Sequence, residues 1–193
     1  TDTGSFGFTS ALDADSEGRE GKFYIWTEEQ IAGVLGPDAG AFKEIYDVTP
    51  GGNWEGHTIL NRSKDLKLGN DDQERRLLEA REKLLAVRAG RIRPQRDDKV
   101  LADWNGLMIG ALARAATVFD RPEWRGAARS AFQFVTENMS LDDGSDARLL
   151  HAWRNGAARH TATLDDYANM CRGALLLFEA TQDHNYINRA KSW

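Results

Sequence analysis

The sequence is poor in the residues that build disulfides and metal centres. Its 193 residues include one cysteine and four histidines. The single thiol, Cys171, excludes an intrachain disulfide, so nothing in the sequence indicates an oxidising compartment. No pair of histidines or cysteines has the spacing of a zinc motif, and we predict neither a metal nor a cofactor.

Long apolar runs and an excess of positive charge are also absent. No stretch approaches the ~18 apolar residues of a membrane span, and no basic, apolar leader is visible, so we predict a cytoplasmic protein without membrane contact. The net charge of −5 gives no attraction to nucleic acid. The densest basic cluster, residues 88–96 (RAGRIRPQR), is interpreted as a solvated helix end, with phosphate binding as the alternative.

Capping motifs and apolar periodicity predict that most of the chain is helical. Capping boxes begin at Thr27 and Thr163, and Asn70 caps a helix predicted over residues 70–89. A helix over residues 100–119 carries small residues on its sides, which predict an inner helix that approaches its neighbours closely. Its apolar residues form one continuous face: Val100, Leu101, Trp104, Leu107, Met108, Ala111, Leu112, Ala115 and Phe119.

Short aromatic or apolar runs, such as residues 21–26 and 147–153, are interpreted as β-like excursions in loops. Helical hairpins separated by such loops predict an all-α fold, a partial (α/α)6 toroid, with an open superhelix as the alternative. Neither end carries a closing signal, so we expect residues 1–193 to be a single fragment of that domain.

The stretch LDADSEGREG resembles the start of a calcium loop. Asp13, Asp15, Glu17 and the following glycine match the first half of an EF-hand, but position twelve is Tyr24, so we reject the EF-hand and keep a looser calcium loop as an alternative. The carboxylates can instead shape a turn. Alternatively, two carboxylates on one side of an extended segment push their pKa values apart, which suits Asp13 and Asp15 to acid–base catalysis.

A second polar group precedes and enters the helix over residues 100–119. Asp98, Lys99, Trp104 and Asn105 supply an acid, a cation, a stacking ring and an amide, the mixture that a sugar-sized ligand needs. The competing interpretation makes Asp97 or Asp98 the helix N-cap. We predict that Asp98 is catalytic and that the other three bind substrate.

Two further pairs are predicted to bind substrate. Asp165 and Tyr167 lie at the start of the helix after residue 163, where Asp166 is explained by the capping box alone. Trp54 and Glu55 lie in a glycine-rich loop and offer a stacking ring and a carboxylate, or else a packing plug.

Several long stretches together resemble the thioredoxin-fused family typified by spermatogenesis-associated protein 20 and bacterial YyaL-type proteins. They are LDADSEGREGKFYIW, GNWEGHTILN, RIRPQRDDKVLADWNGLMIGAL and TLDDYANMCRGALLLFEAT. The resemblance implies an (α/α)6 toroid similar to N-acylglucosamine 2-epimerases and six-hairpin glycosidases. It also implies a thioredoxin-like partner domain in the parent chain, which is absent from residues 1–193.

We therefore expect a carbohydrate-related domain that performs acid–base chemistry on a sugar. The carboxylate-rich loops favour hydrolysis, and the scarcity of histidines counts against an epimerase. An epimerase needs a paired acid and base that exchange a proton next to a carbonyl, and His151, after its strand-like run, is the predicted candidate for one of the two. The alternative is a non-catalytic ligand-binding or scaffold domain that serves the thioredoxin-like partner.

Overall fold

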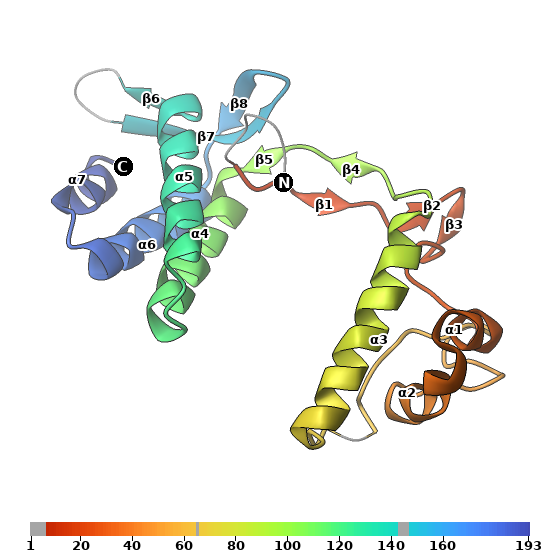
Figure 1. Ribbon diagram of the computed structural model, residues 1–193. Helices are drawn as coiled ribbons and strands as arrows, with labels where there is room; N and C mark the ends of the chain where they lie inside the picture. Colours follow the sequence, from red (N-terminus) through yellow and green to blue (C-terminus); the bar gives the residue numbers. More distant parts are fainter. Residues whose placement is uncertain (1–6, 65, 143–146) are drawn as a thin grey trace. The chain divides into compact units, whose positions relative to one another are not determined.

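The computed structural model describes residues 7–64, 66–142 and 147–193, which form two compact units (Figure 1). Unit 1 comprises residues up to 11 together with 96–193, and unit 2 comprises residues 12–95. Strand β1 (Ala11–Leu12) pairs with β4 (Arg96–Asp97). No helix in the described ranges is long and apolar enough to cross a lipid bilayer.

Unit 2 is a small helical unit with one antiparallel strand pair. Strands β2 (Asp15–Ser16) and β3 (Arg19–Glu20) precede α1 (Glu28–Leu35), the 3-10 turn η1 (Gly36–Asp38), α2 (Ala39–Ile45) and α3 (Asp71–Ala89). The predicted capping box at Thr27 and the Asn70 cap are confirmed. The core gathers the apolar sides of these helices, including Trp26, Ile31, Leu35, Phe42, Leu77 and Leu84.

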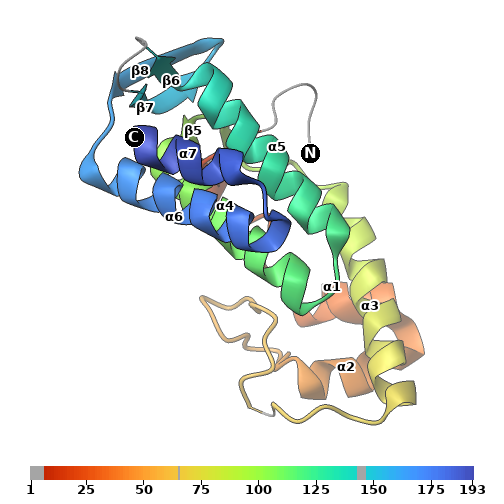
Figure 2. The same cartoon turned by 90° about the vertical axis from the view of Figure 1, so that its left-hand side faces the viewer.

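Unit 1 packs four helices with a four-stranded antiparallel sheet. Helix α4 (Ala102–Val118) lies against α5 (Pro122–Asn138) and α6 (Leu164–Thr181), and α7 (His184–Ser192) packs on α6 (Figure 2). Strand β7 (Ala147–Arg154) pairs with β5 (Val100–Leu101), β6 (Ser140–Asp142) and β8 (Ala157–Thr161). The core includes Val100, Ile109, Phe132, Val135, Leu149, Met170 and Leu177.

The predicted all-α, partial (α/α)6 toroid is wrong, because residues 147–161 build a β-sheet that belongs to the fold. Asn155 and Gly156 have φ angles of 51° and 78° and close a two-residue hairpin between β7 and β8. Positive φ at both positions matches the twist of paired strands. The run at 147–153 is strand as expected, but its backbone pairs with three other strands and is no loop excursion.

The continuous apolar face predicted over residues 100–119 is not the face that α4 buries, whereas the close approach to a neighbouring helix expected from its small residues is confirmed. Its buried residues are mostly small and include Asn105, Gly106, Ile109, Gly110 and Ala113, whereas Trp104 is 51% exposed. A Cβ on Gly106 would lie 2.4 Å from the carbonyl carbon of Asn169 on α6. Because the two backbones meet this closely, the large apolar side chains of α4 cannot lie between them.

The contact at Gly106 predicts a sharp difference between two glycines. Gly106→Ala should destabilise the protein by about 2 kcal/mol or more, because a backbone must shift to admit the methyl group. Gly126→Ala, on α5, meets no atom within 4 Å and should gain about 0.5–1 kcal/mol from better helix propensity. Urea unfolding of both variants measures the two changes. Equal effects would contradict the close α4–α6 approach.

Candidate functional site

A fully buried carboxylate, that of Asp166, lies at the start of α6. The side chain accepts the backbone N–H of Thr163 at 2.7 Å and the hydroxyl of Thr163 at 3.0 Å. These contacts complete the predicted capping box, which is confirmed. The N-terminus of a helix also favours an ionised carboxylate, because its free backbone N–H groups carry partial positive charge.

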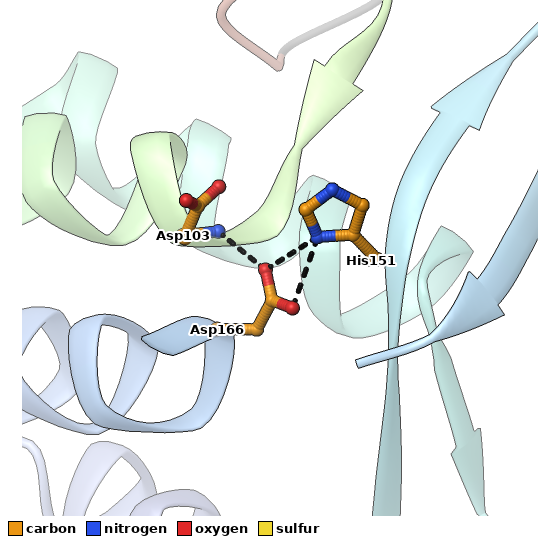
Figure 3. A group of neighbouring side chains, drawn as sticks. All are labelled: Asp103, His151 and Asp166. Carbon is orange, nitrogen blue, oxygen red and sulfur yellow. Dashed lines mark hydrogen bonds and ion pairs between the residues drawn. The ribbon is translucent and has the colours of Figure 1, made fainter. Parts of the chain in front are cut away.

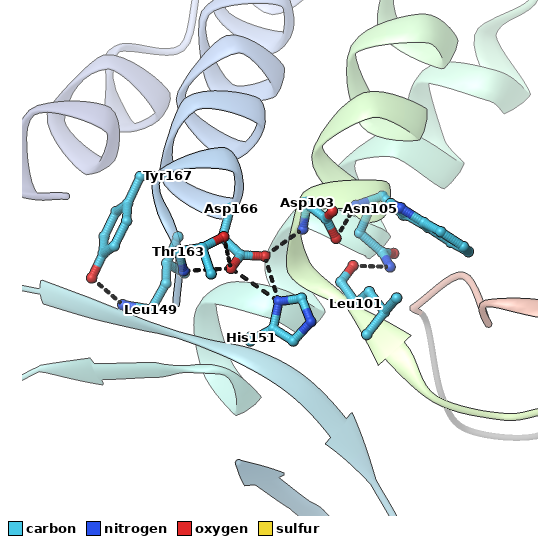
Figure 4. Close-up of polar contacts among 9 residues, drawn as sticks. Leu101, Asp103, Asn105, Leu149, His151, Thr163, Asp166 and Tyr167 are labelled. Carbon is cyan, nitrogen blue, oxygen red and sulfur yellow. Dashed lines mark hydrogen bonds and ion pairs between the residues drawn. The ribbon is translucent and has the colours of Figure 1, made fainter. Parts of the chain in front are cut away.

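Two other elements donate to the same carboxylate (Figure 4). The backbone N–H of Asp103, in the first turn of α4, donates to its Oδ1 at 3.0 Å. Nδ1 of His151, on β7, lies 3.1 Å from Oδ1 and 3.0 Å from Oδ2. The Asp166 carboxylate therefore joins α4, α6 and the sheet, and its charge is met by four donors.

Strand geometry explains why His151 reaches this point. Side chains two residues apart lie on the same side of a strand. His151 therefore shares a side with Leu149, which is buried in the core. The backbone N–H of Leu149 donates to the Tyr167 hydroxyl at 3.2 Å, which holds β7 beside the start of α6.

The arrangement orients the imidazole for proton transfer. A carboxylate that accepts from Nδ1 holds the proton there, and it leaves Nε2 as the basic nitrogen. The His151 side chain is 33% exposed, so a ligand can reach the ring. The Asp103 carboxylate and the second ring nitrogen point to the same side of Asp166 (Figure 3).

The same three side chains have the chemistry of metal ligands. One ligand atom each of Asp103, His151 and Asp166 lies within 4.8 Å of the others. Both Asp166 oxygens, however, already accept hydrogen bonds from protein donors. A cation would have to displace these donors, so the geometry favours a hydrogen-bonded proton-transfer group over a metal centre.

The predicted group around Asp98 forms surface ion pairs. Asp98 accepts from Arg154 Nε at 2.5 Å, and Lys99 Nζ lies 2.7 Å from Asp97. The hydrogen bond from Lys99 holds the pKa of Asp97 below its usual value. Neither aspartate caps α4, whose N-cap is Leu101, so that interpretation of the sequence is wrong.

Other predicted residues in unit 1 divide between structural contacts and exposed positions. Buried Asn105 accepts from the Phe8 N–H at 2.9 Å and donates to the carbonyls of Phe8 and Leu101. The Tyr167 hydroxyl accepts from Leu149, as described above. Trp104 and Asp165 are exposed on the first turns of α4 and α6.

Four predicted residues belong to unit 2. Asp13 Oδ1 accepts the backbone N–H of Asp15 at 3.1 Å, a turn-shaping contact, and both residues are exposed. Trp54 forms an isolated β-bridge with His57, and exposed Glu55 has a φ of 46°. The site around Asp166 contains none of these four.

The sequence pattern indicates His151 but neither of its partners, Asp103 and Asp166. Asp166 was accounted for by its cap, which hid its second role. A shared pattern marks both helix starts, since an aspartate precedes an aromatic residue in Asp103-Trp104 and in Asp166-Tyr167. That pattern could have indicated the two aspartates as candidate site residues, but it does not show that the two helix starts lie close together.

No family model matches the chain. Spermatogenesis-associated protein 20 of Homo sapiens is 29% identical over 96% of the chain, and that of Rattus norvegicus is 28% identical over 96%. An uncharacterised protein of Caenorhabditis elegans is 26% identical over 95% of the chain.

The chain is therefore similar in sequence to spermatogenesis-associated protein 20. It spans 29% of the length of the human protein. The similarity covers both units, because it extends over almost the whole chain. The name of spermatogenesis-associated protein 20 states no chemistry.

The buried carboxylate predicts an asymmetry between neighbouring aspartates. Asp166→Asn should cost about 2–4 kcal/mol of unfolding free energy, since an amide cannot accept from all four donors and one of its own N–H groups faces them. Asp165→Asn, one position away and exposed, should change it by no more than about 0.5 kcal/mol. Chemical denaturation of the two variants measures both. A tolerated Asp166→Asn would show that the four contacts do not stabilise the fold.

Proposed function

We propose that Asp103, His151 and Asp166 form a general acid–base site that acts on a sugar-like substrate. The observation that carries this proposal is the orientation of the His151 imidazole. Its Nδ1 is held by a fully buried carboxylate, while the ring is one-third exposed. A fixed imidazole with one free nitrogen is the usual proton acceptor near neutral pH.

Each residue has a distinct role in this scheme. Nε2 of His151 takes a proton from the carbon next to the substrate carbonyl, and Asp166 stabilises the charge on the resulting imidazolium. Inversion of that carbon requires a new proton on its opposite face, which solvent water would deliver, while the abstracted proton leaves from Nε2 to solvent. The Asp103 carboxylate accepts a hydrogen bond from a substrate hydroxyl. Exposed Trp104, next along α4, offers a ring on which a sugar can stack.

The site favours epimerisation over the hydrolysis that the sequence suggested. Glycoside hydrolysis needs two carboxyl groups that both reach the substrate. Asp166 is fully buried and accepts four hydrogen bonds, so of the two carboxylates in the site only that of Asp103 can reach a substrate. A single oriented base instead suits proton abstraction next to a carbonyl.

A second candidate is a non-catalytic ligand-binding or scaffold domain. It is favoured by the observation that the Asp166 side chain is fully buried and that its hydrogen-bond donors join three elements. In the parent chain such a domain would serve the thioredoxin-like partner that the resemblance to YyaL-type proteins implies. A cytoplasmic location belongs to the same proposal.

Deuterium exchange tests the catalytic proposal. The chain is incubated in D2O with hexoses and N-acetylhexosamines, and NMR follows incorporation of deuterium at the carbon next to the carbonyl. His151→Gln should slow exchange by about 10²–10⁴-fold, the usual contribution of a positioned acid–base group. His160→Gln, an exposed histidine of β8, is the matched control and should leave the rate unchanged.

Two results would contradict the proposal. Exchange that is equal in wild type and His151→Gln would remove the imidazole from the mechanism. No exchange with any of these sugars, in a folded wild-type chain, would favour the scaffold candidate.

A further inference from the structure

We propose that unit 2 carries a binding site for a small dianion of the phosphate-monoester class. The site is a pocket at the β2–β3 hairpin and the end of α3. It shares no residue with the His151 group, so it goes beyond the proposed function and stands apart from it.

The pocket has the size and lining of a small-molecule site. Its volume is about 440 Å³, within the range of ~300–1,000 Å³ that ligand sites occupy. Its charged lining residues are Arg19, Lys22, Arg91 and Glu17. Phe23 and Ile25 supply apolar surface, and His57 supplies a further polar side chain.

The charges in the lining do not cancel. Glu17 Oε2 lies 2.8 Å from Lys22 Nζ, so the one carboxylate is paired with that lysine. Within the described part of unit 2, neither Arg19 nor Arg91 has a carboxylate partner. Three cations and one carboxylate leave a charge of +2, which a dianionic phosphate ester would neutralise.

The guanidinium of Arg91 is fixed in its orientation by contacts within unit 2. Its Nη1 donates to the carbonyls of Phe23 at 3.0 Å and Ile25 at 2.8 Å, and its guanidinium lies 4.0 Å from the centre of the Trp26 ring. Burial and the neighbouring charge of Arg88 lower the pKa of Arg91. A guanidinium fixed in this way loses little conformational entropy when its remaining N–H groups bind phosphate.

Two further arginines reinforce the positive potential. The guanidinium carbons of Arg88 and Arg93 lie 5.7 Å and 5.8 Å from the centre of the Phe23 ring. A purely structural role, in which Arg91 anchors the loop at Phe23 and Ile25, accounts for the position of Arg91. It does not account for Arg19, which lines the same pocket without a carboxylate partner among the described residues of unit 2. A concave site in a chain of net charge −5 favours a small ligand over a polyanion such as nucleic acid.

Isothermal titration with glycerol 3-phosphate, inorganic phosphate and uncharged glycerol tests the site in the full 193-residue chain. Glycerol 3-phosphate should bind saturably and tighter than inorganic phosphate, and glycerol should not bind. Arg19→Ala should weaken binding about tenfold or more, the loss of one charge-assisted hydrogen bond. Glu17→Gln should strengthen it about threefold, because a nearby negative charge is removed.

The matched control is Arg75→Ala, which removes a surface arginine from α3 outside the pocket. Unchanged binding in this control and in His151→Gln supports a local site that is independent of the acid–base group. Absence of saturable binding, or equal losses in Arg19→Ala and Arg75→Ala, would overturn the proposal. Equal affinity for inorganic phosphate would overturn the assignment to a monoester.

Discussion

The buried charge of Asp166 is the constraint around which unit 1 is arranged. An ionised carboxylate removed from water must be met by several donors, or the fold loses more than it gains. Here the donors come from the helix that carries it, from the first turn of α4 and from β7. The relative positions of two helices and a sheet are therefore tied to one side chain.

Close packing of α4 on α6 brings these donors within reach. Gly106 and Gly173 face one another, so that a Cβ on Gly173 would lie 3.0 Å from the Gly106 carbonyl oxygen. The consequence appears on the other face of α4, where Trp104, Leu107 and Met108 remain exposed. A seam of small residues thus positions the site and leaves a large aromatic ring beside it.

A structural role for Asp166 does not compete with a role in proton transfer. The contact that completes the helix cap also aligns the His151 ring, and a ring fixed in this way needs no reorganisation before it accepts a proton. Unit 2 offers a different chemistry, because Arg88, Arg91 and Arg93 lie against the Phe23 and Trp26 rings. The two proposed sites would bind different ligands: a neutral polyol at the His151 site and an anion in the pocket of unit 2.

Local features of this protein follow from the sequence by itself. The capping boxes at Thr27 and Thr163, the Asn70 cap and the strand at residues 147–153 depend on neighbours within a few positions. The sheet, the buried face of α4 and the His151 site were decided by the tertiary structure. Asp166 meets its donors on Asp103 and His151 across 63 and 15 residues. The spacing of residues along the chain does not determine the distance between two helices. The distance between α4 and α6 is set by their packing at Gly106.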